Sequence, residues 1–188
     1  MGNNKIIKNP IFDNKKNEEA ELKDGKKVWL SRSPCIKVVV LAVNKSSIFV
    51  IAEKRSKTVV DGPGLWVIPS GYLDWDETGW EAAVRELYEE TGFYVPKYKS
   101  NLIFNNDKEP WLIRTDPGEN RQNVALIYCL IYKFPERLPI DVEQHKDEEI
   151  EEAKWIPIDQ LSLDGRIWGF DHDIRIKMAV EKFKDYLI

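Results

Sequence analysis

Runs of apolar, β-branched residues bounded by polar segments recur along this chain and predict the strands of a sheet. Residues 35–43 and 48–52 form two such runs, and the polar residues 44–47 between them predict a hairpin. The longest later run, residues 123–132, predicts a buried strand. Shorter runs predict further strands at residues 26–30, where an edge strand is expected, 103–104 and 150–156.

Helical periodicity is strongest over residues 79–91 and recurs over residues 171–187. Thr78 followed three residues later by Glu81 forms a capping-box pattern, in which each side chain bonds to the other residue's backbone N–H. Gly92 stands just past the last turn, where a left-handed residue is commonly needed. The sequence therefore marks both ends of the first helix.

Three glutamates share one face of that first helix. At about 100° per residue, Glu86, Glu89 and Glu90 fall within one stripe. A solvated acidic surface is the ordinary explanation, but such a surface more often interleaves lysine, and Arg85 is the only cation between Gly71 and residue 96. Clustered carboxylates without matching cations suit a hard divalent ion such as Mg²⁺. The pattern thus favours a metal site.

The segment from Gly71 to Phe93 carries a family resemblance. Gly71, Glu77, the triplet 85–87, the pair 89–90 and the pair 92–93 stand at the spacing of a complete Nudix box, so the chain resembles the Nudix hydrolases. Residues 66–70 resemble the short strand that enters the box. The resemblance implies an α+β fold, an α/β/α sandwich in which helices flank a mixed β-sheet. It also implies hydrolysis of a nucleoside diphosphate linked to another moiety.

The resemblance assigns roles by position. Glu86, Glu89 and Glu90 are expected to bind Mg²⁺ or Mn²⁺, with the Gly71 carbonyl as a further ligand. Arg85 is expected to assist catalysis and to pair with a supporting Glu77, which would hold the loop against the helix. These roles suit the chemistry, because a diphosphate is shielded from attack until cations neutralise its oxygens and activate a water.

The general base is left open between two residues. Glu149 lies in the acidic segment 147–152, and Nudix enzymes often use a glutamate from the corresponding loop as a base or as a ligand for an extra metal. A solvated loop explains any single glutamate of this segment equally well. Glu86 is the competing base.

Candidate substrate-binding residues follow the same resemblance. Arg55 and Lys57 come after a strand where the family often places a cation for phosphates, although surface solvation is nearly as good an explanation. Arg121 lies in segment 116–121, which together with the tripeptide Phe170-Asp171-His172 resembles elements of Nudix enzymes acting on ADP-ribose.

Some of these residues also have a structural interpretation. Asp171 can be a plain helix N-cap, with His172 in the first turn. Among the aromatic residues, Phe170, Tyr72 and Trp111 are the candidates for stacking on a base, because loops present aromatic faces to ligands.

Composition and charge limit the possible domain organisation, partners and location. The chain has 188 residues, 43% of them hydrophobic, which suffices for one substantial core. We expect residues 1–25 to be a flexible leader and residues 26–188 to be a single catalytic domain. The formal net charge of −4 gives no general attraction to nucleic acid, so no nucleic-acid partner is expected. The polar leader lacks an apolar signal core and no membrane span is present, so we expect a cytoplasmic protein. A homodimer is a hypothesis.

The sequence thus predicts a Mg²⁺-dependent pyrophosphatase. ADP-ribose-like substrates come first and nucleoside triphosphates second. The alternative from another class is a non-catalytic Nudix-fold module that senses or regulates through such a nucleotide, although regulators often lose box carboxylates or carry a DNA-binding domain. RNA decapping ranks lower because the charge pattern shows no basic groove.

Overall fold

The chain divides into two units, residues 1–32 and residues 33–188. The structure, a computed structural model, describes residues 18–30, 34–115, 123–139, 148–162 and 165–188. In the first unit β1 (Glu18–Glu21) pairs antiparallel with β2 (Lys27–Leu30). The strand predicted at residues 26–30 is therefore present, and its partner comes from the segment expected to be a leader. The boundary at residue 25 stays a prediction.

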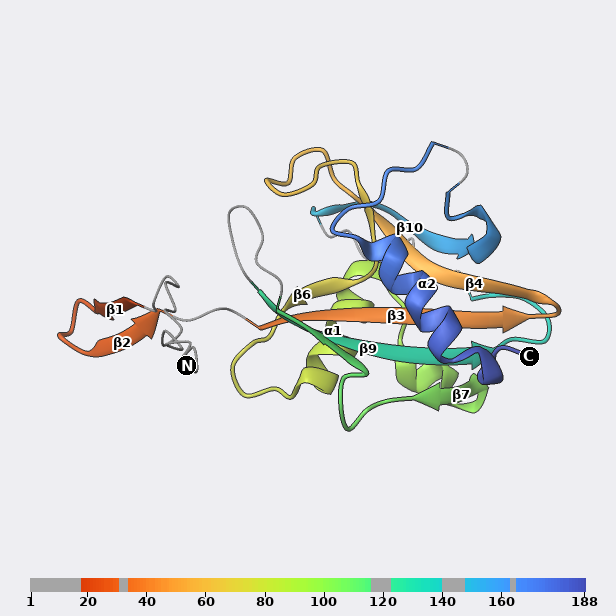
Figure 1. The fold of residues 1–188 in the computed structure, drawn as a ribbon, viewed down its shortest axis with the longest axis horizontal. Helices are drawn as coiled ribbons and strands as arrows, with labels where there is room; N and C mark the ends of the chain where they lie inside the picture. Colours follow the sequence, from red (N-terminus) through yellow and green to blue (C-terminus); the bar gives the residue numbers. More distant parts are fainter. Residues whose placement is uncertain (1–17, 31–33, 116–122, 140–147, 163–164) are drawn as a thin grey trace, which may run out of the picture. The chain divides into compact units, whose positions relative to one another are not determined.

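The second unit is built on a mixed eight-stranded sheet (Figure 1). Its central order is β10-β4-β3-β9-β7, with β5 added to β4, β6 to β3 and β8 to β9. The central pair β3 and β9 is parallel, and every other pair is antiparallel. The strands are β3 (Pro34–Asn44), β4 (Ser47–Arg55), β5 (Trp66–Val67), β6 (Ser70–Tyr72), β7 (Leu102–Asn105), β8 (Leu112–Arg114), β9 (Val124–Lys133) and β10 (Ile150–Pro157).

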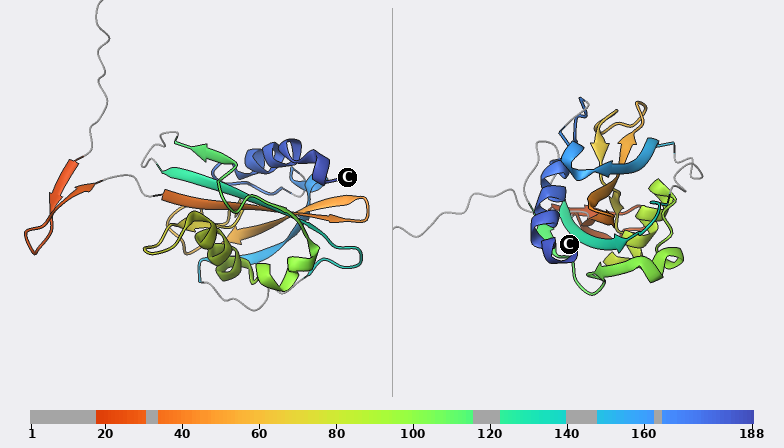
Figure 2. Two further views of the ribbon diagram at one scale, coloured as in Figure 1. Left: turned by 90° about the horizontal axis from the view of Figure 1, so that it is seen from below. Right: turned by 90° about the vertical axis from the view of Figure 1, so that its right-hand side faces the viewer.

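Two helices cover the opposite faces of this sheet (Figure 2). They are α1 (Gly79–Thr91) and α2 (His172–Lys182), and short 3-10 turns lie at η1 (Val95–Asn101), η2 (Ile158–Gln160) and η3 (Lys184–Tyr186). Strand β3 explains how both faces become apolar, because its side chains alternate between them. Val38 and Val40 pack in the cluster that holds Leu87 of α1, while Val39 packs in the cluster that holds Ile176 of α2. The predicted α/β/α sandwich is confirmed.

Three local differences from the sequence prediction have identifiable causes. The strand expected at residues 66–70 is split into β5 and β6 around Ile68 and Pro69, and a proline has no N–H for a ladder. The helix expected to reach residue 187 ends at Lys182, because Phe183 leaves helical geometry and packs its ring 4.6 Å from that of Phe104. Strand β8 was not predicted. Within the described ranges, no helix is both long and apolar enough to cross a bilayer.

Candidate active site

The position of α1 is fixed at both ends by local hydrogen bonds. The Glu81 amide donates to Thr78 Oγ1 at 3.2 Å, and the Thr78 amide donates to Glu81 Oε2 at 2.8 Å, so the predicted capping box is present. Gly92 closes the helix in the left-handed region, with φ 69°. The carboxylates of this helix are therefore presented on a well-defined scaffold.

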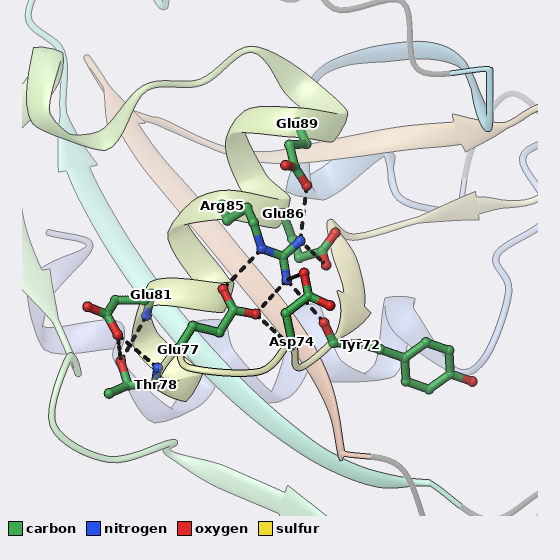
Figure 3. Close-up of polar contacts among 8 residues, drawn as sticks. All are labelled: Tyr72, Asp74, Glu77, Thr78, Glu81, Arg85, Glu86 and Glu89. Atoms are coloured by element: carbon green, nitrogen blue, oxygen red, sulfur yellow. Dashed lines mark hydrogen bonds and ion pairs between the residues drawn. The ribbon is translucent and has the colours of Figure 1, made fainter. Parts of the chain in front are cut away.

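Arg85 pairs with Glu77 through two parallel hydrogen bonds (Figure 3). Its Nε donates to Glu77 Oε2 at 3.0 Å and its Nη2 donates to Oε1 at 2.7 Å. The Asp74 amide also donates to Glu77 Oε1 at 2.8 Å. These bonds, chiefly those from Arg85, lower the pKa of Glu77 below its usual value. The pair fastens the loop that precedes α1 to the helix, as the sequence predicted.

The other edge of the same guanidinium binds two more carboxylates. Arg85 Nη1 donates to Glu86 Oε1 at 2.7 Å and to Glu89 Oε2 at 3.0 Å, while Nη2 donates to the Tyr72 carbonyl at 3.1 Å. Figure 3 shows the guanidinium lying among these groups. Asp74 Oδ2 lies 3.7 Å from Nη2, so one positive charge is shared by the four carboxylates of Asp74, Glu77, Glu86 and Glu89, and the cluster keeps an excess of negative charge.

Gly71 lies directly against the Glu86 carboxylate. A Cβ atom at this position would overlap all the atoms of that carboxyl group, so only glycine leaves the space open. Glu86 is 8% exposed. Burial raises the pKa of Glu86, and the hydrogen bond from Arg85 opposes this rise. The structure therefore brings Gly71, Arg85 and Glu86 together, as expected from the box.

Glu90 contacts a residue that the sequence did not indicate. Its Oε2 accepts from the Ser70 amide at 2.7 Å, and it interacts with Glu53 of β4, which is fully buried. Burial, followed by the charge of Glu53, raises the pKa of Glu90 well above its usual value. One feature of the sequence could have indicated Glu53, because an acidic residue there follows the apolar run of β4.

This donor set fits a divalent cation. Two adjacent buried carboxyl groups cannot both ionise at low cost without a compensating positive charge. Among the residues that the structure describes, no three acidic, histidine or cysteine side chains already converge as a cation cage. Glu89 is bonded to Arg85, but its side chain is 52% exposed and can turn without leaving the surface. The groups that can hold a cation are Glu86, Glu89, Glu90 and the Gly71 carbonyl.

A cavity of about 800 Å³ adjoins the box at Ser70 and Gly71. Arg55, Glu149 and Phe170 also line it, so three of the predicted residues share this pocket with Gly71. Arg55 Nη2 lies 3.9 Å from Glu149 Oε2, and Arg55 Nε donates to the Asp61 carbonyl at 2.8 Å. The arginine is thus already engaged by the pocket's own groups.

Comparison with known proteins identifies the family. The NUDIX domain model matches residues 33–175. The chain belongs to the Nudix family. It is 31% identical over 126 residues to "Nudix hydrolase 6" of Arabidopsis thaliana, covering 66% of this chain and 40% of that protein. It is 30% identical over 134 residues to "RNA pyrophosphohydrolase" of Erythrobacter litoralis, covering 65% of this chain and 75% of that protein.

The Nudix fold is also found among solved structures. The NUDIX domain of Shewanella oneidensis NrtR, crystallised with ADP ribose, aligns with a TM-score of 0.58 and 19% identity, covering 81% of this chain and 88% of that one. At this identity the likeness establishes the fold. The chain spans less than half the length of the Arabidopsis relative, so only the Nudix portion is compared there.

Of the other predicted residues of this Nudix chain, some line the pocket and others do not. Lys57 is exposed and does not line the pocket. Arg121 lies outside the described residues. Tyr72 lines the pocket, whereas the Trp111 ring packs 5.6 Å from Phe183 beside the core, so its expected place at a base was wrong. Asp171 stands at the N-cap position of α2, as the structural interpretation expected, but its φ is 57° and its side chain makes no cap hydrogen bond.

His172 is the main residue of the pocket that sequence reasoning underestimated. It is 1% exposed, its Nδ1 accepts from the Ile68 amide at 3.0 Å, and its Nε2 lies 2.8 Å from Lys37 Nζ. Burial, then the charges of Lys37 and Arg175, lower the pKa of His172 well below its usual value. A histidine in the first turn of a predicted helix does not indicate these contacts, because both partners, Ile68 and Lys37, are far away in the chain.

Proposed function

We propose that this Nudix protein is a Mg²⁺-dependent pyrophosphatase that cleaves a nucleoside diphosphate linked to another moiety. The observation that carries this proposal is the meeting of the acidic face of α1 with a large pocket at Gly71. A diphosphate lying at this glycine would have carboxylates for a metal on one side and room for its organic group on the other. Mn²⁺ is the expected substitute ion.

Glu86, Glu89 and Glu90 would hold the cation, with the Gly71 carbonyl beside them. When bound, the ion neutralises diphosphate oxygens and lowers the pKa of the attacking water. The chain's own groups do the rest. Arg85 and Glu77 keep the loop fixed against α1, and either Glu86 or Glu149 takes the proton from the water. The water oxygen bonds to one phosphorus as the bridging P–O bond breaks, yielding a nucleoside monophosphate and a phosphorylated second product.

ADP-ribose-like compounds are our first substrate class. The NrtR domain that shares this fold was crystallised with ADP ribose, and two aromatic residues, Tyr72 and Phe170, line the pocket with partly exposed rings suited to a base. Nucleoside triphosphates come second. The relative named RNA pyrophosphohydrolase favours a third candidate, the 5′ end of an RNA, which the net charge of −4 disfavours.

A sensing module without activity is the competing proposal. Such a module would not require a full set of box carboxylates, yet here Glu77, Glu86, Glu89 and Glu90 are all present and make the contacts described above. A buried carboxylate costs free energy unless it is paired, hydrogen-bonded or bound to a metal, so the adjacent buried Glu53 and Glu90 favour a bound cation. Hydrolysis therefore accounts for the retained glutamates better than sensing does.

A substrate panel tests this proposal. Wild type and Glu89→Gln, Glu90→Gln are incubated with ADP-ribose, dinucleoside polyphosphates, nucleotide sugars, nucleoside triphosphates and a 5′-triphosphorylated oligoribonucleotide, in Mg²⁺ and in EDTA. Glu81→Gln is the matched control, since this glutamate lies on the same helix but outside the cluster. We expect turnover of one class that disappears in the double variant and in EDTA and persists in the control. Nucleotide binding without turnover would favour the sensor.

The cytoplasmic location and the homodimer remain predictions. Light scattering after size-exclusion chromatography decides the second, because a mass of 22.0 kDa alone would show a single chain.

A further inference from the structure

The pocket has a cationic wall formed by β3 and α2. Lys37 of β3 and Arg175 of α2 both line it, together with His172. In the β3–β6 ladder Ile36 stands opposite Gly71 and Lys37 opposite Ser70, so the lysine lies one ladder position from the box glycine. A phosphate chain lying at Gly71 is therefore within reach of this wall.

Arg175 differs from the other pocket arginine in its contacts. Its side chain is partly buried, and its guanidinium makes one weak contact, from Nη1 to Met178 Sδ at 3.7 Å. Throughout the described part of the chain, no carboxylate pairs with it. Arg55, by contrast, lies 3.9 Å from Glu149 and donates to the Asp61 carbonyl. Arg175 thus keeps its hydrogen-bond donors available for a ligand anion.

The described acidic residues of the pocket are Asp61, Glu148, Glu149 and Asp171. They are all exposed, and the nearest in sequence, Asp171, accepts the Arg175 amide through its carbonyl without an ion pair to its guanidinium. His172 contacts Lys37 and stands three residues before Arg175 on α2, and its burial, followed by the charges of Lys37 and Arg175, lowers its pKa well below the usual value. Arg175 therefore brings to this wall a positive charge that pairs with no carboxylate of the described residues.

We propose that Arg175 and Lys37 bind nonbridging phosphate oxygens of the substrate. This inference rests on the proposed function and adds to it an anion subsite independent of the metal. Guanidinium groups match phosphate oxygens in pairs, and a lysine supplies a point charge beside them.

Calorimetry in EDTA tests the subsite apart from turnover. ADP and adenosine are titrated into wild type, Arg175→Met, Arg175→Lys and Lys37→Met. We expect Arg175→Met and Lys37→Met each to weaken ADP binding by about tenfold or more and to leave adenosine binding unchanged. The ADP affinity of Arg175→Lys should lie between those of wild type and Arg175→Met, since lysine keeps the charge but not the paired donors. The matched control is Lys177→Met, whose amine pairs with Asp173 on the surface of the same helix.

Wild-type affinity for ADP in a folded Arg175→Met or Lys37→Met protein would overturn the proposal. Failure of the proposed function gives a different result, because the wild type would then hydrolyse none of the substrates in the Mg²⁺ panel. In an active enzyme the same two substitutions should raise KM and change kcat less than threefold.

Discussion

Helices α1 and α2 cover opposite faces of one sheet and bring charge to neighbouring regions by different means. The partners of α1 come largely from its own neighbourhood in the chain, with Thr78 at its N-terminus and Glu77 eight residues from Arg85. His172 of α2 meets Ile68 across 104 residues and Lys37 across 135 residues. A site built from residues close together in the chain can be recognised as a sequence motif, whereas a site built from residues far apart in the chain cannot.

The two regions also balance charge differently. In the cluster of α1 a single arginine pairs with four carboxylates, and the remaining negative charge suits a cation. On α2 an arginine and a nearby lysine act on a histidine of lowered pKa, and their positive charge suits an anion. Each substitution below should change the properties of one region and leave those of the other unchanged.

Gly71→Ala should have the largest effect. The new Cβ overlaps the Glu86 carboxylate and displaces it, so we expect metal affinity and turnover to fall by about a hundredfold. Circular dichroism should show a folded protein, and ADP binding in EDTA should be retained. Unchanged turnover with wild-type metal affinity would contradict the role of this glycine.

Glu77→Gln should come next. The amide keeps one acceptor but loses the charge that pairs with Arg85, so turnover should fall by about tenfold. Glu81→Gln serves as the control in the same assay, because it alters the cap and not the cluster. Equal activities of the two variants would mean that the Arg85 pair does not position the site.

The α2 region should show itself in the pH dependence of stability. His172 takes up a proton in the unfolded chain near pH 6.5 but only at much lower pH when folded. The free energy of unfolding should therefore fall as the pH drops below 6.5, by up to about 1.4 kcal/mol per pH unit until the folded-state pKa is reached. Urea unfolding of wild type and His172→Gln at pH 7.5 and 5.5 measures this. An identical pH dependence in both proteins would refute it.

Thr78→Ala should have the smallest effect. Losing the cap should lower the free energy of unfolding by about 1 kcal/mol. Because the cap lies outside the cluster, metal affinity should stay at the wild-type value. Thermal melting and a metal titration on the same sample check both statements, and a loss of metal affinity would show that the helix end and the cluster are coupled.

The sequence predicted what short segments determine. The caps of α1, its acidic face and the Arg85–Glu77 pair all lie within 23 residues, and the resemblance they carried led to the correct fold. The sequence did not indicate Glu53 or His172 in the same way, because their importance comes from burial and from partners that lie far away in the chain. The end of α2 was misplaced for the same reason, since Phe183 turns toward Phe104 of β7.

Metal binding tests the central claim most directly. Mn²⁺ is titrated into wild type, Glu81→Gln and Glu86→Gln, Glu89→Gln, Glu90→Gln without substrate, and free Mn²⁺ is followed by electron paramagnetic resonance. We expect saturable binding to wild type and to Glu81→Gln, and its loss in the triple variant. Equal binding by all three proteins would contradict a cation site on the acidic face of α1.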